Sequence, residues 1–198
     1  SDFNTNSGEA MSMGEKSPIA ISNPVAAGKL ALAEALINLL PSGVSKLSDI
    51  KISANWMASP DNAQRKTDLF NTVKELTQKV CKPWRITIPV GKDSLSMKTI
   101  WQKDKKTNLS PQSLIISAFS KIKNVKKSIT PQLIDNNELS LVYLDLSKTK
   151  KRLGGSIFSE VTQQTNLETP NLEFIDEFPK IYNYLATKIN KKRIFSFH

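Results

Sequence analysis

Two residues one helical turn apart carry oxygen atoms that could hold a hard cation. Glu34 and Asn38 occupy positions i and i+4 of an apolar-periodic segment, so a helix would place both side chains on one face. A carboxylate and an amide oxygen on one face can share Mg²⁺, whose other ligands are usually phosphate oxygens and water. The same spacing also fits a surface pair or a hydrogen bond between packed helices, and spacing alone favours these simpler interpretations.

A second candidate is a glycine that follows an apolar run. Gly91, Lys92, Asp93 and Ser94 come directly after residues 86–90. A glycine there would let the backbone N–H groups, the Lys92 ammonium and the Ser94 hydroxyl approach a phosphate. The glycine spacing departs from that of a P-loop, and a tight turn with local hydrogen bonds explains the same residues. The pattern alone is therefore only a weak indication of phosphate binding.

Other classes of site lack the residues that they need. The sequence has one cysteine, Cys81, and one histidine, His198, which is the last residue. An intramolecular disulfide framework, a cysteine-cluster metal site and a histidine-based triad are therefore excluded within these 198 residues. The glycine pair before Ser156 is more typical of a plain turn that opens a helix.

The chain is strongly basic, with 28 Lys+Arg against 18 Asp+Glu and a formal net charge of +10. Three basic runs stand out, at residues 121–127, 148–152 and 191–193. Only four of the basic residues are Arg, which base readout and bidentate phosphate binding favour, and no aromatic residues are interleaved as stacking platforms. We interpret the runs as solvated lysine faces, keep weak polyanion contact as a minor alternative and expect no nucleic-acid partner.

Apolar periodicity and turn residues predict alternating helices and strands. Asn23 and Pro24 are typical of a helix start, and Pro179 should break or kink a later helix. We expect a loop over residues 1–20, helices over 23–40, 66–80, 156–163 and 170–190, a polar hairpin-like connection at 104–108, and strands over 50–57, 85–90, 96–101, 113–119, 139–145 and 193–197. This alternation predicts an α/β or α+β fold.

The chain is long enough for one large domain or two small ones. A change to polar composition around Thr130 and Pro131 is a plausible domain boundary. No apolar run approaches the roughly 20 residues of a membrane helix, and no signal-peptide pattern opens the chain. We therefore expect a cytoplasmic protein without a membrane partner.

Seven segments occur in an order that is specific to one enzyme family. They are residues 8–18 (GEAMSMGEKSP), 33–38 (AEALIN), 52–57 (ISANWM), 88–99 (IPVGKDSLSMKT), 110–114 (SPQSL), 130–132 (TPQ) and 153–156 (LGGS). Together they closely resemble the large, single-chain form of the phosphoribosylformylglycinamidine synthases, over essentially all 198 residues. The chain is similar to the second half of the synthetase core of that family.

The resemblance implies a specific α+β architecture. Residues 1–125 would be an aminoimidazole-ribonucleotide-synthetase-like domain that contributes strands to a barrel shared between two synthetase halves. Residues 126–198 would be the incomplete start of a second α/β domain. The remaining domains of the same enzyme, including a glutaminase with a cysteine nucleophile, would be its partners.

The resemblance also implies an activity and its cofactors. Family members convert formylglycinamide ribonucleotide, glutamine and ATP to the amidine, glutamate, ADP and phosphate in purine biosynthesis. Glu34 and Asn38 match Mg²⁺-ligand positions beside a bound ATP or ADP, which in this half is a tightly held structural ADP. Gly91 and Ser94 match a loop that touches ATP and substrate in the related small form, whereas Lys92 replaces an Asn ligand there and makes a metal role at that spot doubtful.

Two departures limit what this chain is expected to do. The family pattern has an aspartate ligand upstream of Ser1 and a further ligand beyond His198. No residue of this chain matches a catalytic position of the family. We therefore expect the chain alone to be inactive as an amidotransferase; a non-catalytic nucleotide-binding or structural module is the alternative.

Overall fold

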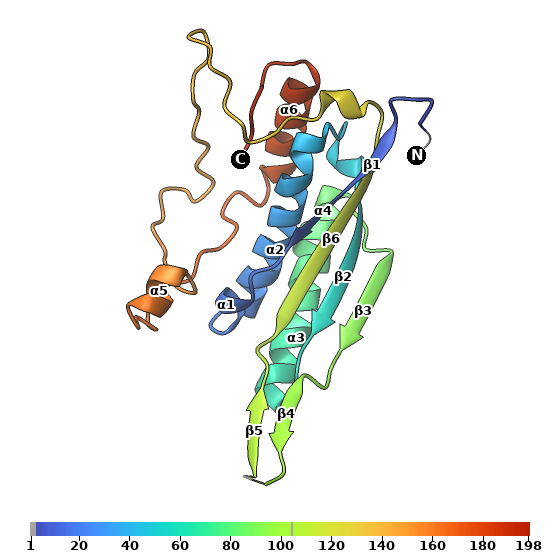
Figure 1. Cartoon of the computed structure of the whole chain (residues 1–198). Helices are drawn as coiled ribbons and strands as arrows, with labels where there is room; N and C mark the ends of the chain where they lie inside the picture. Colours follow the sequence, from blue (N-terminus) through green and yellow to red (C-terminus); the bar gives the residue numbers. More distant parts are fainter. Residues whose placement is uncertain (1–2, 104) are drawn as a thin grey trace.

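Four strands form the main sheet of the computed structural model, which describes residues 3–103 and 105–198 (Figure 1). The strands are β1 (Gly8–Gly14), β2 (Lys51–Met57), β3 (Val90–Ser94) and β6 (Ser113–Ile122), in the order β1-β6-β2-β3. Strand β6 is antiparallel to both β1 and β2, whereas β2 and β3 are parallel. Ile116 pairs with Gly14 on one side and with Ala54 on the other, which fixes the register across the sheet.

A separate hairpin extends beyond the end of this sheet (Figure 1). Strand β4 (Lys98–Trp101) pairs antiparallel with β5 (Lys106–Leu109). The expected strand over 96–101 overlaps β4. Residues 106–108 of the expected connection over 104–108 belong instead to strand β5, and residue 104 lies outside the described residues.

Helices cover one face of the main sheet. Helix α2 (Pro24–Leu39) begins where predicted, because Asn23 Oδ1 accepts a hydrogen bond from the Ala26 N–H. The short helix α1 (Ser17–Ala20) precedes it. Beside α2 runs α3 (Ala63–Glu75), which continues through the π-helical turn η3 (Leu76–Cys81) into α4 (Lys82–Trp84). The predicted helices over 23–40 and 66–80 are confirmed.

The core lies between these helices and the sheet. Leu36 of α2, Ile52 of β2 and Ile116 of β6 are all fully buried. In β6 the even-numbered positions from Leu114 to Ile122 face this core, and the odd-numbered positions face the opposite side of the sheet. A mixed α+β fold, as the sequence predicts, is therefore observed.

Helix α2 also bears on the expectation about membranes. With the 3₁₀ turn η1 (Leu40–Ser42) it makes a span, Pro24–Ser42, that is long and apolar enough to cross a membrane by length and composition. The sequence-based statement that no apolar run approaches this length was too strong. More than half of this span is buried inside the protein, and the core helix of a soluble protein passes the same test. The span is weak evidence for a membrane helix.

The last helix returns to the first part of the chain. Helix α6 (Phe178–Asn190) packs near η1 and the 3₁₀ turn η2 (Leu47–Asp49). Phe178 stacks on Trp84 with ring centroids 4.5 Å apart, and the Leu47 N–H donates to Asn183 Oδ1 at 2.9 Å. Pro179 lies in the first turn of α6, where a missing N–H costs nothing, so it starts this helix rather than kinking one over 170–190.

Two predictions for the first half of the chain were wrong. The expected loop over residues 1–20 contains β1, whose alternate residues Glu9, Met11 and Met13 are exposed as in a strand with one covered face. The expected strand over 85–90 is irregular, and the strand falls instead on Val90–Ser94. Arg85 adopts a left-handed conformation at the end of α4, which interrupts an extended run there.

Two strands predicted for the second half are also absent from the described structure. Residues 139–145 are irregular and exposed, and Leu141 is 90% exposed, because no described strand pairs with their backbone. Residues 193–197 make only an isolated bridge between Ser196 and Thr130. The helix predicted over 156–163 is confirmed in part as α5 (Ile157–Val161), with Ser156 as its N-cap, and the remaining turn, η4 (Val125–Lys127), follows β6.

Candidate functional site

Glu34 on α2 reaches the chain just beyond the end of β1. Its Oε2 accepts a hydrogen bond from the Glu15 N–H at 2.8 Å, and its Oε1 lies 2.5 Å from Lys16 Nζ. About a third of each of the Glu34 and Lys16 side chains is exposed. The carboxylate is thus held in one orientation by a backbone donor and already attracts a cation.

Asn38 lies one turn further along α2 and contacts the same strand. Its Nδ2 donates to the Met13 carbonyl oxygen at 3.1 Å, which leaves Oδ1 free to accept or to coordinate. The predicted pair therefore projects from one helix face toward the carboxyl end of β1. The hydrogen bonds of both side chains also hold α2 against β1. They therefore agree with the simpler interpretation as well, in which the pair only packs the helix against its neighbour.

Gly14 permits this close approach of strand and helix. A Cβ atom at Gly14 would lie 2.1 Å from the Ala31 carbonyl oxygen and 2.6 Å from the Ala35 nitrogen, both in the backbone of α2. The Ser12 hydroxyl donates to the Ala35 carbonyl oxygen at 2.5 Å on the same side. Only glycine at position 14 lets the Glu15 N–H reach Glu34. Sequence reasoning treated this segment as a loop and missed the role of Gly14.

The donor set of this pair fits a magnesium ion that also binds phosphate. The carboxylate and the free Asn38 Oδ1 are hard oxygen ligands, and Mg²⁺ commonly takes one or two protein ligands and completes its shell with phosphate and water. Within residues 3–103 and 105–198 no group of three or more His, Cys, Asp or Glu side chains could hold a metal on its own. A cation here would replace Lys16 as the partner of Glu34.

Gly91 and Ser94 lie on β3, at the other edge of the sheet. A Cβ atom at Gly91 would meet nothing within 4 Å, so the backbone there is open to approach. The Ser94 carbonyl oxygen accepts from the Ala58 N–H at 2.9 Å. With β6 and β2 between them, β1 and β3 are separated by three strand spacings, roughly 14 Å. The structure therefore does not bring Gly91 and Ser94 together with Glu34 and Asn38.

Several buried side-chain oxygens near the end of β2 lack a hydrogen-bond partner. They are Asn55 Oδ1, Ser59 Oγ and Gln112 Oε1. Asn55 is level with Lys92 of β3 in the register of the sheet. Sequence analysis gave these three side chains no role of their own, because their residue types and spacing match no site pattern.

Cys81 is unsuited to nucleophilic chemistry. It lies buried at the end of η3, and this burial raises the pKa of its thiol to about 11. A thiol of this pKa carries little thiolate near neutral pH, and the thiolate is the reactive form.

Comparisons with known proteins place the chain in a family. A family model described as the FGAR-AT PurM_N-like domain matches residues 1–121. Phosphoribosylformylglycinamidine synthase II from Thermotoga maritima is 17% identical, with a TM-score of 0.49 over 66% of this chain and 20% of that one. T. maritima PurL complexed with ATP is 18% identical, with a TM-score of 0.46 and the same coverage.

A further solved structure is that of thiamine-monophosphate kinase from Stenotrophomonas maltophilia K279a. It is 13% identical, with a TM-score of 0.40 over 64% of this chain and 34% of that one. The chain spans about a fifth of the length of the two T. maritima structures. The family match over residues 1–121 covers more than half of the sequence and confirms the resemblance found in its motifs: the chain belongs to the FGAR-AT PurM_N-like domain family.

Proposed function

We propose that this chain is part of an ATP-dependent carbon–nitrogen ligase of purine biosynthesis. That enzyme would convert formylglycinamide ribonucleotide and glutamine to formylglycinamidine ribonucleotide, with the ammonia supplied by a glutaminase domain. Membership of the FGAR-AT PurM_N-like domain family supports this proposal. The chain's own contribution would be a site for Mg²⁺ with ATP or ADP.

The observation that carries the proposal is the pairing of Glu34 and Asn38 at the end of β1. Both approach the same stretch of backbone, at Met13 and Glu15, and because Asn38 bonds to it through Nδ2, its Oδ1 stays free to coordinate a cation. A bound Mg²⁺ would neutralise charge on the nucleotide phosphates. Glu34 and Asn38 would hold and orient it, and Lys16, released from Glu34, would supply a second positive charge.

Gly91 and Ser94 remain candidate contacts to nucleotide or substrate. The open space over Gly91 supports close approach of a phosphate to the backbone of β3. Because this edge is three strands away from Glu34, we propose that it makes a separate contact.

The domain division and partners belong to the same proposal. We place a barrel-contributing domain at residues 1–125 and the start of a second domain at 126–198, in a cytoplasmic enzyme. The sheet face opposite the helices exposes Met11, Met13 and Phe119, which supports packing against another synthetase half. The exposed residues 139–145 support a strand that needs further sheet to pair with.

Thermal unfolding with and without Mg-ADP tests the nucleotide site. A ligand that binds only the folded chain raises the melting temperature, and we expect a magnesium-dependent rise that Glu34→Gln abolishes. Glu75→Gln is the matched control, because Glu75 pairs with Lys29 at 3.3 Å away from this site and its loss should leave the rise intact. An equal rise in Glu34→Gln would contradict the proposed ligand.

A non-catalytic nucleotide-binding or structural module is the second candidate. A nucleotide-binding module would bind Mg-ADP as the first candidate does, whereas a purely structural module would not. Both forms of the second candidate differ from the first in turnover by the intact enzyme. We propose that no catalytic residue lies in these 198 residues, so the chain alone should give no product from ammonia, ATP and formylglycinamide ribonucleotide. Product formation by the chain alone would refute this proposal.

A further inference from the structure

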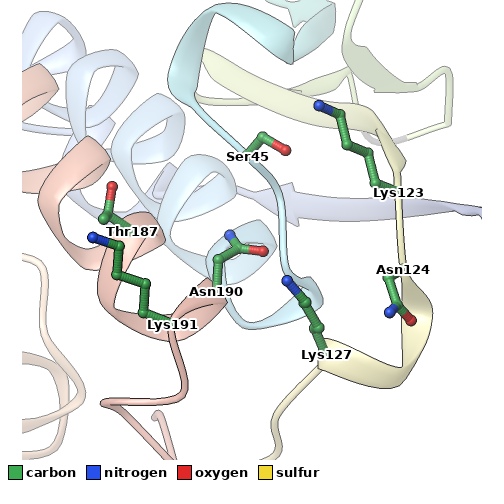
Figure 2. A pocket seen from close by; sticks show the side chains of 7 residues that line it. All are labelled: Ser45, Lys123, Asn124, Lys127, Thr187, Asn190 and Lys191. Atoms are coloured by element: carbon green, nitrogen blue, oxygen red, sulfur yellow. The ribbon is translucent and has the colours of Figure 1, made fainter.

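Two basic runs that are far apart in the sequence meet around one hollow. Lys123 and Lys127 come from the run at 121–127, and Lys191 comes from the run at 191–193. The hollow has a volume of about 300 Å³, at the lower end of the range for small-ligand sites. In Figure 2 the Lys127 side chain extends toward Asn190, and Lys191 lies along the last turn of α6 beside Thr187.

The wall that carries Lys123 and Lys127 is fixed by contacts outside the hollow. The Val125 N–H donates to the Asn6 carbonyl oxygen at 2.8 Å, and the Ile129 N–H donates to the Pro41 carbonyl oxygen at 2.9 Å. Gly43 adopts a φ of +84° and would place a Cβ atom 3.6 Å from Lys127 Cβ. The turn at Gly43 therefore seats η4 against the end of η1.

The opposite wall is the C-terminal end of α6. Asn190 Nδ2 donates to the Val44 carbonyl oxygen at 3.0 Å, which ties this end to the loop that carries Ser45. Ala186 and Ile189 are buried on the inner side of the same turn. The three lysines thus project from backbone that is held in place, although their side chains are themselves long and rotatable.

No carboxylate within residues 3–103 and 105–198 pairs with Lys123, Lys127 or Lys191, and none of these three ammonium groups donates a hydrogen bond there. A neighbouring larger hollow along β1 and β6 differs, because Glu9 and Asp49 line it. Lys191 offsets the dipole at the end of α6, but that effect does not concern the other two lysines. An anion bound in the hollow would supply the counter-charge that these lysines lack.

We propose that this hollow is a binding site for a phosphate or diphosphate group of a small molecule. Ammonium groups from two walls, with the Ser45 hydroxyl and the Asn124 amide beside them, match the charge and hydrogen-bond acceptors of such a group. A polynucleotide fits less well, since no aromatic side chain lines the hollow for base stacking. The site is separate from Glu34 and Asn38, which do not line it.

Isothermal titration of the whole chain tests the site. Orthophosphate, pyrophosphate, ADP and a short single-stranded RNA would be titrated at constant ionic strength, with chelator present so that no magnesium-dependent site contributes. We expect saturable pyrophosphate binding that Lys127→Gln weakens about tenfold, because one charge-assisted hydrogen bond is lost. The matched control is Lys126→Gln, since Lys126 lies on the same turn and does not line the hollow; its effect should be below about twofold.

Comparison of the titrated ligands shows which kind of molecule carries the phosphate group. Tighter binding of ADP than of pyrophosphate would assign a nucleotide, and the reverse order would assign a free diphosphate; both support the site if Lys127→Gln weakens the binding. Absence of pyrophosphate and ADP binding to the folded wild type, or equal losses in Lys126→Gln and Lys127→Gln, would overturn the proposal. RNA binding alone, with a steep salt dependence, would assign the lysines to polyanion contact instead.

Discussion

Residues 113–122 and residues 139–145 have similar patterns and different structures. The first contains Leu, Ile and Phe, the second contains Leu, Val and Tyr, and the sequence predicts a strand in each. The first is β6, which pairs with β1 and β2 and buries Ile116 completely. The second is irregular, and its Tyr143 is 88% exposed. β propensity produces a strand only where a neighbour satisfies the backbone groups.

The same contrast holds for the two parts of the chain. The main sheet packs with α2 and α3 into one unit over residues 8–122. In residues 131–177 the short helix α5 is the only regular element described (Figure 1). Helix α6 then returns to the packed unit through Trp84 and Phe178. The following substitutions, from the largest expected effect to the smallest, compare residues of the same type in the two parts.

Phe178→Ala should have the largest effect on stability. Phe178 is 2% exposed and stacks on Trp84, so its removal should lower the free energy of unfolding by about 3–5 kcal/mol. Phe158→Ala, at a half-exposed site in α5, should cost about 0.5 kcal/mol or less. Urea unfolding monitored by Trp fluorescence measures both. Equal losses of unfolding free energy in the two variants would show that α5 is as well packed as α6, contrary to this prediction.

Leu36→Ala should lower the free energy of unfolding by about 2–5 kcal/mol, because this side chain is fully buried between α2 and the sheet. Leu141→Ala removes a side chain that is 90% exposed, so it should change the free energy of unfolding by less than about 0.5 kcal/mol. Chemical denaturation gives the two values. A cost above about 2 kcal/mol for Leu141→Ala would mean that residues 139–145 are buried.

Cys81 should make stability depend on alkaline pH. Its pKa is raised from about 9 in the unfolded chain to about 11 in the folded one, so its stabilising contribution is complete below pH 9 and is lost as pH rises toward 11. The loss should be on the order of 2 kcal/mol. To measure it, the free energy of unfolding of wild type and of Cys81→Ala is determined at pH 8 and at pH 11. The drop between the two pH values should be larger in wild type by this amount.

Alkylation rates extend this comparison to the exposed segment. At pH 8 Cys81 should react with iodoacetamide far more slowly than a cysteine introduced by Val142→Cys in a Cys81→Ala background, because Val142 is 81% exposed. Equal rates, or a wild type whose stability is the same function of pH as that of Cys81→Ala, would contradict the burial of the thiol.

Gly155→Ala should have the smallest effect of the four substitutions. It should lower the free energy of unfolding by about 1–2 kcal/mol, because Gly155 has a φ of +73°, which disfavours a residue with a Cβ atom. A Cβ atom there would also lie 2.9 Å from Ile19 Cα, so α1 would have to shift. Gly91→Ala, with no atom within 4 Å, should be nearly neutral for stability. Thermal unfolding compares the two. A neutral Gly155→Ala would show that residues 154–155 are not anchored to α1.

Local signals predicted the parts of the fold that depend on near neighbours in the sequence. Asn23 followed by Pro24 located the start of α2, and Leu and Val residues at helical spacing located α3 and η3. The strand β1 was missed because Gly8, Ser12 and Gly14 lack β propensity; pairing with β6 makes it a strand. Pro179 was interpreted as a break because its position within the first turn depends on where α6 begins.

The candidate site was predictable only in part, for a similar reason. Helical spacing placed Glu34 and Asn38 on one face, but the backbone that they contact comes from β1 and the residue that follows it, more than 15 residues earlier. The hollow between η4 and α6 joins residues more than 60 positions apart, so no local pattern could show that Lys127 and Lys191 meet. Family motifs supplied the remaining expectations for Gly91 and Ser94.

Hydrogen–deuterium exchange with and without Mg-ADP tests the account most directly. We predict slow exchange in β6 and α2, exchange near the unprotected rate at residues 139–145, and a magnesium-dependent slowing at residues 13–16 and 34–38. Protection of residues 139–145 without ligand would contradict the comparison between the two parts. Ligand protection that spares residues 13–16 and 34–38 would contradict the proposed nucleotide site.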